Sequence, residues 1–403
     1  MKIYDELEFR GIICQSTNKE KVKKILNNEK SVFYLGFDPT ANSLHVGSFV
    51  QLSVISKLQK CGHSPICLFG GGTGFIGDPS GKNSMRKLMS KEEIEHNVSC
   101  FKKQISRFLD ISKVKFVNNA DWLCDLNYIE FLRDIGKYFN VNKMLTYDCY
   151  RNRLQDGLTL MELNYMIMQS YDFLYLYKNY GCKIQIGGSD QWSNIISGVD
   201  LVRKKENAEV FGLTTNLLTK SDGKKMGKTE KGAIWLDAEK TSPYEFYQYW
   251  RNVQDSDVIK CVKMLTDINI ETIKEFENFE GSKLNEVKEV LAYELTKSVH
   301  GEQEAEKSRK ASEKIFKSGG ISTEIPTKNL DSSSFEDEIG IVDVLFLSGI
   351  VSSKSEGRRL VQQNGISVNG NLVDLEFKLT KQNLNSGVIV RKGKKNHIRV
   401  VLS

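Results

Sequence analysis

Thr40, His45 and Gly47 stand close together in a segment whose residue types could bind a phosphate. An apolar run at residues 31–35 precedes the segment and predicts a buried strand, and helical periodicity at residues 49–58 follows it. Free N–H groups and the helix dipole favour an anion at such a turn, where Thr40 and His45 add side-chain donors. Gly47 would let a ligand approach the backbone. The same residues are also compatible with an ordinary turn that contains a hydrogen-bonded histidine.

A second segment carries three lysines, Lys224, Lys225 and Lys228, around Gly227. A mobile cationic loop of this kind can close over a polyphosphate and neutralise the charge that develops in a transition state. Taken alone, the cluster is a weak signal, because most lysine clusters belong to a solvated surface. Its presence in the same predicted domain as the turn favours a nucleotide site built from both segments.

Tyr165, Gln169 and Asp172 are spaced at i, i+4 and i+7, which places them on one face of a predicted helix. A polar stripe within an apolar helix must pair its buried groups, and a pocket wall would pair them with a ligand. Tyr34, on the first predicted strand, could oppose this wall. A solvent-facing stripe is the alternative interpretation.

The elements that would position these residues alternate between strands and helices over residues 31–225. Further strands are predicted at residues 64–69, 183–186 and 213–218, and glycine or polar residues follow each of them. This alternation predicts an α/β fold with a parallel sheet that is covered on both faces. Ligands bind such sheets beyond the carboxyl ends of the strands, where the polar residues stand.

The distribution of charge indicates a polyanionic partner. Residues 341–403 contain ten basic and four acidic residues, an excess equal to the net charge of +6 of the whole 403-residue chain. Residues 242–316 show helical periodicity, and residues 318–338 read as a flexible linker. A basic C-terminal piece on a neutral body is typical of proteins that bind nucleic acid.

The composition of the chain indicates the cellular compartment in which the protein is expected. No apolar run is long enough to span a membrane, and the N-terminus lacks the pattern of a secretory signal. The eight cysteines form no C-x-x-C pair, so neither a disulfide framework nor a metal site is expected. These features favour a cytoplasmic protein without protein-side metal ligands.

Six sequence blocks together resemble the bacterial-type tyrosyl-tRNA synthetases of class I, over essentially the full length. The blocks lie at residues 36–40, 45–47, 77–82, 170–173, 185–192 and 225–229. The resemblance implies a Rossmann-like catalytic domain at residues 1–229 and a helical anticodon-binding domain at residues 230–317. It also implies a linker at residues 318–338 and a small α/β RNA-binding module at residues 339–403.

The resemblance implies a role for each matching residue. Tyrosine would be held through its phenol, ammonium and carboxylate by Tyr34, Asp78, Tyr165, Gln169, Asp172 and Gln191. ATP would be bound by Gly36, Asp38, Gly47, Ser48, Gly188, Asp190 and Lys228. The residues implied to assist the reaction at the polyphosphate are Thr40, His45, Lys82, Arg86, Lys225 and Lys228.

The implied reaction is tyrosine activation by ATP, with Mg²⁺ accompanying the nucleotide, followed by transfer of the tyrosyl group to tRNA(Tyr). Ser48 departs from the family pattern, which usually has a second histidine there, and serine cannot carry charge. Gly227 and Thr229 stand where serines occur in the general class pattern, a variant that tyrosine enzymes often show.

Two other functions stay open at this point. One is an RNA-binding protein that has lost charging activity, which Ser48 and the basic tail would fit. The other is a synthetase for a different aromatic amino acid. The resemblance also implies a homodimer, for which Phe131, Ile135, Tyr138 and Phe139 within residues 122–142 are the predicted interface. The alternative interpretation is that these four side chains face the core.

Overall fold

A computed structural model describes residues 1–80, 89–151, 153–154, 157–229, 232–318, 327–332, 335, 337–393 and 396–402. The chain forms two compact units. The first comprises Met1–Asp237 and Ile259–Ile273, and the second comprises Ala238–Val258 and Lys274–Ser403. None of the described helices is long and apolar enough to cross a membrane.

The first unit is built on a six-stranded sheet with the order β1-β6-β5-β2-β3-β4. All neighbouring strands are parallel except β1, which pairs antiparallel with β6. The strands are β1 (Ile13–Ser16), β2 (Val32–Phe37), β3 (Ser64–Phe69), β4 (Lys115–Asn118), β5 (Cys182–Gly188) and β6 (Phe211–Thr215). The predicted parallel α/β sheet is confirmed, but the strand predicted at residues 213–218 begins at Phe211 and ends at Thr215.

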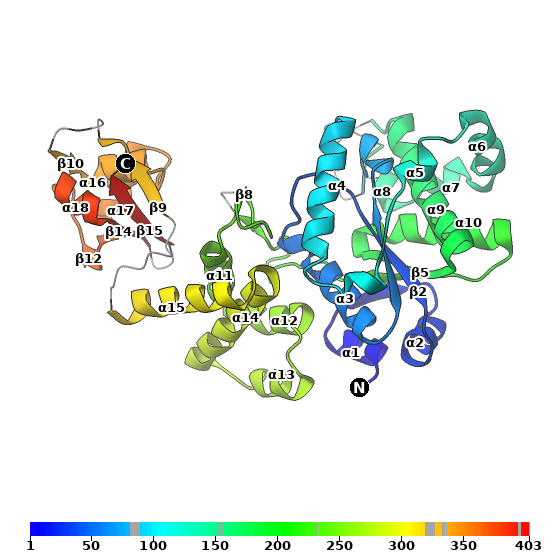
Figure 1. The fold of residues 1–403 in the computed structure, drawn as a ribbon, viewed down its shortest axis with the longest axis horizontal. Coiled ribbons are helices and arrows are strands. Elements are labelled where there is room, and N and C mark those ends of the chain that lie inside the picture. The colour runs from blue at the N-terminus through cyan, green and yellow to red at the C-terminus, as the bar shows by residue number, and fades with distance from the viewer. Residues whose placement is uncertain are drawn as a thin grey trace. The chain divides into compact units, whose positions relative to one another are not determined.

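Helices cover both faces of this sheet. Figure 1 shows α3 and α4 on one side and α9 and α10 on the other. The helices of this unit that precede the lysine segment are α1 (Ile3–Phe9), α2 (Lys19–Asn28), α3 (Phe49–Lys60), α4 (Lys91–Ile105), α5 (Ala120–Leu123), α6 (Tyr128–Asp134), α7 (Val141–Leu145), α8 (Asp148–Arg151), α9 (Leu160–Tyr180) and α10 (Trp192–Glu206).

The longest of these helices, α9, begins and ends at clear local signals. Thr159 caps its N-terminus in a capping box with Glu162, and Gly181 ends it in the left-handed region at φ +63°. Glu162 also forms a buried ion pair with Arg153, at 3.0 Å. The predicted helix face is confirmed, because Tyr165 and Asp172 are both buried on α9.

Residues 259–273 belong to the first unit, although they lie within the predicted helical domain at residues 230–317. Arg10 is buried and donates to the backbone carbonyls of Lys263, Thr266 and Ile268. The buried Lys57 ammonium donates to Thr266 as well. A boundary at residue 229 is therefore wrong for this stretch, because contacts between residues distant in sequence decide where it packs.

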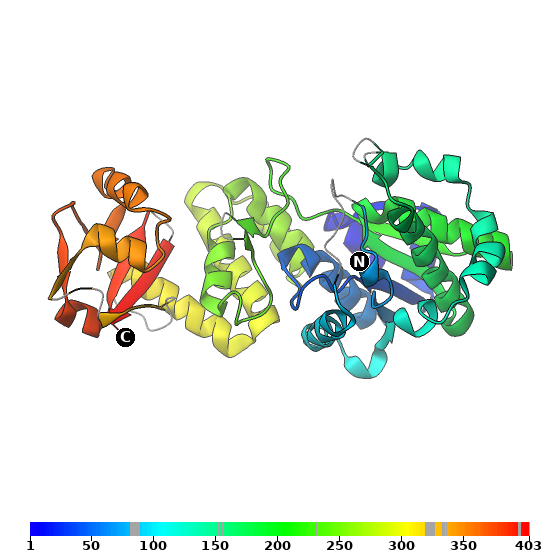
Figure 2. The ribbon, with the colours of Figure 1, turned by 90° about the horizontal axis from the view of Figure 1, so that it is seen from above.

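The second unit contains helices that precede a small α/β module. They are α11 (Pro243–Arg251), α14 (Leu284–His300) and α15 (Glu302–Ser318), while α12 (Asp255–Leu265) and α13 (Ile270–Phe276) cross between the units. The module contains α16 (Ile341–Leu347), α17 (Lys354–Gln362) and α18 (Lys381–Ser386). Figure 2 shows the orange helices α16 and α17 beside the red strands β14 and β15.

The module has its own sheet and its own apolar core. Five strands pair in the order β12-β11-β14-β15-β9. They are β9 (Thr327–Leu330), β11 (Ile366–Val368), β12 (Asn371–Leu372), β14 (Val388–Lys392) and β15 (Asn396–Leu402), with β10 (Glu338–Gly340) and β13 (Lys378–Thr380) paired separately. Asn369 and Gly370, between β11 and β12, both have positive φ, as an Asn-Gly hairpin turn requires.

The linker predicted at residues 318–338 is wrong for part of its length. Residues Thr327–Leu330 form β9, which pairs in parallel with β15 near the end of the chain. Glu338 begins β10, which pairs with β13. The segment is polar because β9 is an exposed edge strand with only Leu330 buried, and polarity alone cannot distinguish such a strand from a linker.

The predicted interface residues pack inside the first unit. Ile135 is 3% exposed, and Phe131, Tyr138 and Phe139 pack against the same core cluster. The structure therefore supports the core interpretation of these side chains. Four other apolar side chains of this region are exposed: Tyr128, Ile129, Leu132 and Val141.

Candidate functional site

A cavity of about 490 Å³ opens at the carboxyl ends of β2 and β5 in the first unit. These neighbouring strands lead to helices on opposite faces, which is the place where parallel sheets bind ligands. The predicted site residues that line the cavity are Tyr34, Gly36, Asp38, Thr40, His45, Gly47, Ser48, Asp78, Tyr165, Gln169, Asp172, Gly188, Asp190, Gln191 and Lys225. Lys82 and Arg86 lie outside the described residues, as does the side chain of Lys228, whose backbone forms the two-residue strand β7 (Lys228–Thr229).

One end of the cavity holds a buried hydroxyl and a buried carboxyl. Within the described part of the chain, the Tyr34 hydroxyl has no hydrogen-bond partner although the residue is 1% exposed. Asp172 is equally buried, and its carboxylate accepts from Asn119 Nδ2 at 2.9 Å and from Trp122 Nε1 at 2.8 Å. Burial raises the pKa of Asp172 to about 7, although both hydrogen bonds act to lower it. This end can pair with a polar group on a ligand.

The sequence contains no signal for Asn119 as a site residue, and Trp122 stands there only at the start of the predicted interface. Both follow β4, a four-residue strand too short for a periodic signal. The Asn119 N–H donates to the Phe69 carbonyl of the neighbouring strand, which brings the side chain beneath Asp172. The pairing of β3 with β4 therefore brings the Asn119 and Trp122 donors to Asp172. No local pattern in the sequence indicates this pairing.

The high pKa of Asp172 predicts an unusual dependence of stability on pH. The folded chain binds this proton more tightly than the unfolded chain, so stability present at low pH is lost as pH rises towards 7. Relative to Asp172→Asn, the wild type should lose roughly 2–3 kcal/mol between pH 5 and pH 8. Urea unfolding of both full-length chains at the two pH values measures this change in the free energy of unfolding. Any destabilisation by the amide at position 172 that does not depend on pH cancels, because each chain is compared with itself. Parallel pH profiles would contradict the assignment.

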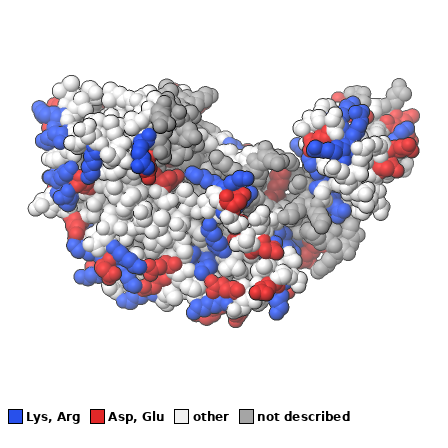
Figure 3. Space-filling model, turned by 180° about the vertical axis from the view of Figure 1, so that it is seen from behind, with Lys and Arg blue, Asp and Glu red and all other residues white. Residues whose placement is uncertain are grey.

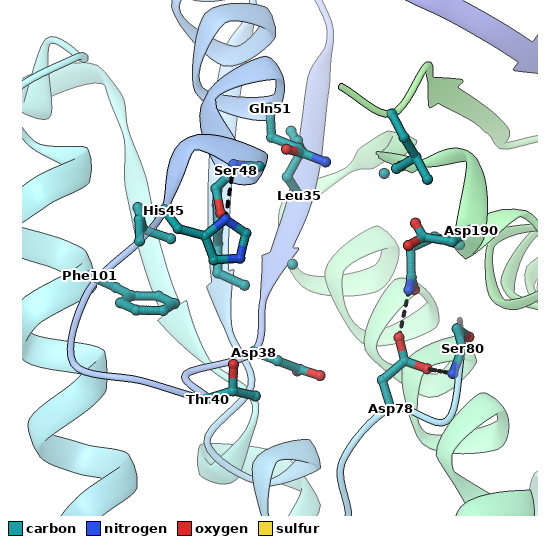
Figure 4. Close-up of a pocket in the computed structure, with 18 of the residues that line it drawn as sticks. Leu35, Asp38, Thr40, His45, Ser48, Gln51, Asp78, Ser80, Phe101 and Asp190 are labelled. Carbon is teal, nitrogen blue, oxygen red and sulfur yellow. Dashed lines mark hydrogen bonds between the residues drawn. The ribbon is translucent and has the colours of Figure 1, made fainter. Parts of the chain in front are cut away.

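A second polar cluster lies deeper along α9 and α10. Asp78 accepts from the Ser80 N–H at 2.8 Å and from Gln191 Nε2 at 2.6 Å, as Figure 4 shows. Gln191 Oε1 in turn accepts from Gln169 Nε2 at 3.3 Å and from Asn194 Nδ2 at 3.1 Å. The buried Gln169 Oε1 has no partner among the described residues. A carboxylate beside a spare amide oxygen suits a ligand ammonium group.

Tyr165 and Asp38 extend the hydrogen-bond network around Asp172. The Tyr165 hydroxyl donates to Asp38 Oδ2 at 2.8 Å, and Thr73 Oγ1 donates to Asp38 Oδ1 at 3.3 Å. Thr73 Oγ1 also accepts from Asn119 Nδ2 at 3.0 Å. Asp38 and Asp172 are thus joined by hydrogen bonds through the neutral side chains of Thr73 and Asn119.

The turn at residues 40–48 holds its histidine in a defined orientation. The Gly47 N–H donates to His45 Nδ1 at 2.9 Å, where His45 caps the short 3₁₀ helix η1 (Val46–Ser48) (Figure 4). Because Nδ1 accepts, the neutral imidazole carries its proton on Nε2. A Cβ at position 47 would lie 2.6 Å from His45 Cε1. Gly47 is therefore needed for the histidine itself, in addition to the predicted approach of a ligand.

The lysine segment packs directly on this turn. Gly227 has φ +81°, and a Cβ there would lie 2.8 Å from Val46 Cβ. The Ile234 N–H donates to the Gly227 carbonyl, and the Ile234 carbonyl accepts from the Val46 N–H. Lys225 Nζ lies 3.6 Å from a carboxylate oxygen of Asp190. The two segments, predicted separately, form one wall of the cavity.

Glycines leave room on the opposite side. A Cβ at Gly188, the last residue of β5, would lie 2.7 Å from Asp190 Oδ1. Gly36, in β2, is exposed towards the cavity, and Ser48 lines it just before α3. Together with Asp190 these residues form a surface of backbone and carboxylate oxygen that a sugar or a base can contact.

The chain resembles known proteins over both of its parts. A family model described as "tRNA synthetases class I (W and Y)" matches residues 26–317. A second, "Tyrosine--tRNA ligase SYY-like C-terminal domain", matches residues 320–400. The tyrosine–tRNA ligase of Acetivibrio thermocellus is 54% identical over 404 residues, which cover 99% of each chain. The chain belongs to the tyrosine–tRNA ligase family. The Clostridium kluyveri member of this family is likewise 54% identical with 99% coverage.

Solved structures extend the likeness to the fold. A C-terminally truncated mitochondrial tyrosyl-tRNA synthetase of Aspergillus nidulans has a TM-score of 0.71 and 28% identity, covering 78% of this chain and 94% of that one. The tyrosyl-tRNA synthetase of Archaeoglobus fulgidus, at 17% identity and TM-score 0.58, shares the fold, covering 76% of this chain and 99% of that one. The six-stranded sheet is the Rossmann-like sheet of the class I family.

Proposed function

We propose that the chain is a tyrosine–tRNA ligase, which forms tyrosyl-adenylate from tyrosine and ATP and transfers the tyrosyl group to tRNA(Tyr). The observation that carries the proposal is the partner-free Tyr34 hydroxyl beside the Asp172 carboxylate, both buried. An apolar aromatic ligand would leave the Tyr34 hydroxyl unpaired at a cost, whereas a phenol satisfies it. The named relatives of the family support the same substrate.

Tyrosine would lie along α9 with its phenol towards Tyr34 and Asp172. Its ammonium group would meet Asp78 and the free oxygen of Gln169, with Tyr165 on the same helix face. Gln191, which already donates to Asp78, would stand next to the substrate carboxylate. The cavity thus offers an acceptor for each tyrosine N–H or O–H group.

ATP, as its Mg²⁺ complex, would occupy the side formed by β5 and the turn. Asp38, Gly188 and Asp190 would hold the adenosine, with Gly36 and Ser48 beside it. Thr40 and His45 would bind the polyphosphate, and the Nε2 proton of His45 is the donor for this. Lysines and arginines complete the site in this proposal: Lys82, Arg86, Lys225 and Lys228.

The chemistry requires positioning more than acid–base catalysis. A tyrosine carboxylate oxygen attacks the α-phosphorus of ATP, the bond to the β-phosphate oxygen breaks, and pyrophosphate leaves with its electron pair. Lys225 and the other proposed cations beside the turn would stabilise that charge. A terminal ribose hydroxyl of the tRNA then attacks the adenylate carbonyl, and AMP leaves. No side chain forms a covalent bond in either step.

Tyrosine-dependent ATP–pyrophosphate exchange tests the proposal. The wild type should exchange with tyrosine and show only background with phenylalanine and tryptophan. Exchange with another aromatic amino acid instead would favour the alternative substrate. Tight tRNA binding without any exchange would favour a protein that has lost charging activity.

The contact between Gly47 and His45 makes a further prediction. Gly47→Ala should displace the imidazole, because its Cβ overlaps the ring. We expect the rate of adenylate formation to fall about tenfold or more, since one aligned donor to the polyphosphate is lost. The tyrosine dissociation constant without ATP should stay within about twofold, because the α9 residues are untouched. Gly136→Ala is the matched control, since a Cβ at position 136 meets only Leu132, at an ordinary 3.5 Å, and Gly136 does not line the cavity.

The C-terminal module would bind tRNA through basic residues that acidic ones do not neutralise. Figure 3 shows both signs of charge on this module. Lys354, Lys378 and Lys392 form ion pairs with acidic neighbours. Arg358 and Arg359 on α17 are exposed, which leaves their guanidinium groups accessible to phosphate oxygens.

The active protein would be a cytoplasmic homodimer. The exposed Tyr128, Ile129, Leu132 and Val141 supply an apolar surface on the first unit that a second copy could cover. Sedimentation equilibrium measures the state, and Ile129→Glu should shift it towards monomer. A monomer at micromolar concentration of the wild type would contradict the dimer.

A further inference from the structure

Helix α4 has a buried face whose residues are spaced at i, i+4 and i+7, like the polar face of α9. Asn97, Phe101 and Gln104 occupy these positions, and all three are buried. Unlike the face of α9, this one does not supply donors to the cavity directly. Its polar members bond instead to the backbone and side chains of residues 39–44.

Gln104 uses both ends of its amide on this segment. Its Nε2 donates to Ser43 Oγ at 3.0 Å, and its Oε1 accepts from the Leu44 N–H at 2.8 Å. Gln104 is 7% exposed, and both of its partners are buried. Leu44 immediately precedes His45, so the amide fixes the backbone that carries the imidazole.

Asn97 holds the other end of the same segment. Its Nδ2 donates to the Pro39 carbonyl at 2.9 Å, directly before Thr40. Between the two amides, Phe101 extends from α4 towards Thr40 and His45 and lines the cavity (Figure 4). The backbone on either side of the two proposed polyphosphate ligands is therefore held from one rigid helix.

We propose that Asn97 and Gln104 are positioning residues that set the placement of Thr40 and His45 for the polyphosphate of ATP. The inference rests on the proposed function. A turn that carries ligands must be held within a fraction of an ångström to stabilise a transition state, and helices hold such positions better than loops. Gln104 acts through His45 and touches no substrate itself.

The test compares two buried glutamines whose side-chain amides each donate one hydrogen bond and accept one. Gln59, on α3, is buried and bridges the N–H and the carbonyl of Asp110, both at 2.9 Å. Gln104→Met and Gln59→Met each remove one donated and one accepted hydrogen bond and keep similar volume, so their costs in thermal stability should be comparable. Their effects on ATP should differ.

Pyrophosphate exchange and equilibrium dialysis supply the readouts. For Gln104→Met we expect kcat/KM for ATP to fall roughly tenfold, while the tyrosine dissociation constant without ATP changes less than about twofold. For Gln59→Met both quantities should stay within about twofold of the wild type. Equal effects of the two variants on ATP, or an unchanged ATP dependence of Gln104→Met, would overturn the inference.

A conservative variant keeps the test decisive if Gln104→Met does not fold. Gln104→Glu, when protonated, reproduces one donor and one acceptor, so its ATP activity relative to wild type should rise as pH falls from 8 to 6. A flat ratio would count against the positioning role. A wild type without tyrosine-dependent exchange would instead refute the proposed function, which separates the two failures.

Discussion

Replacing Asp172 by alanine is expected to lower kcat/KM for tyrosine in pyrophosphate exchange about 10²- to 10³-fold while changing that for phenylalanine less than tenfold. Asp172 is the buried acceptor at the end of the cavity where we propose that the phenol binds. A tyrosine hydroxyl would lose its acceptor in the variant, whereas phenylalanine never used it. The tyrosine-to-phenylalanine ratio of kcat/KM is the measured quantity.

Tyr34→Phe is the matched variant for this measurement. It removes a hydroxyl that has no partner among the described residues, so the free protein loses no known hydrogen bond. We expect its ratio to fall about tenfold, less than for Asp172→Ala, because a neutral hydrogen bond is weaker than one to a carboxylate. An unchanged tyrosine-to-phenylalanine ratio of kcat/KM in Asp172→Ala would show that this end of the cavity does not bind the phenol.

A chain that ends at Ser318 is expected to keep pyrophosphate exchange within about twofold and to lose tRNA charging about 100-fold or more. The cavity belongs wholly to the first unit, while the C-terminal module has a separate core. Exchange and charging are measured on the same preparations at one salt concentration, since phosphate contacts weaken with salt.

The truncation is placed at residue 318 and not at residue 341, where the basic region begins, because β9 lies between the two positions. A chain that ends at residue 340 would keep β9 without β15, its parallel partner, and so leave strand edges unpaired. Substituting glutamate for both Arg358 and Arg359 provides a control that keeps the module folded. This variant should lose charging but not exchange. Equal loss of both activities in the Ser318 truncation would contradict separate roles for the two parts.

Local patterns predicted much of the site. The strand-to-helix turn, the lysine segment and the polar face of α9 each depend on residues near one another in sequence, and described residues of all three line one cavity. Boundaries were less predictable. Residues 259–273 return to the first unit through Arg10 and Lys57, which lie more than 200 positions earlier in the chain.

By itself, the sequence determined the fold class, the family and most of the residues that line the cavity, because helical and strand periodicity and short motifs encode local structure. Only the tertiary structure revealed that Asn119 and Trp122 support Asp172, that Gly47 is needed for His45, and that Gln104 holds the turn. Each of these contacts depends on strand pairing, on close packing or on a helix reaching a distant loop. Such pairings depend on the whole fold, and no short window of residues specifies them.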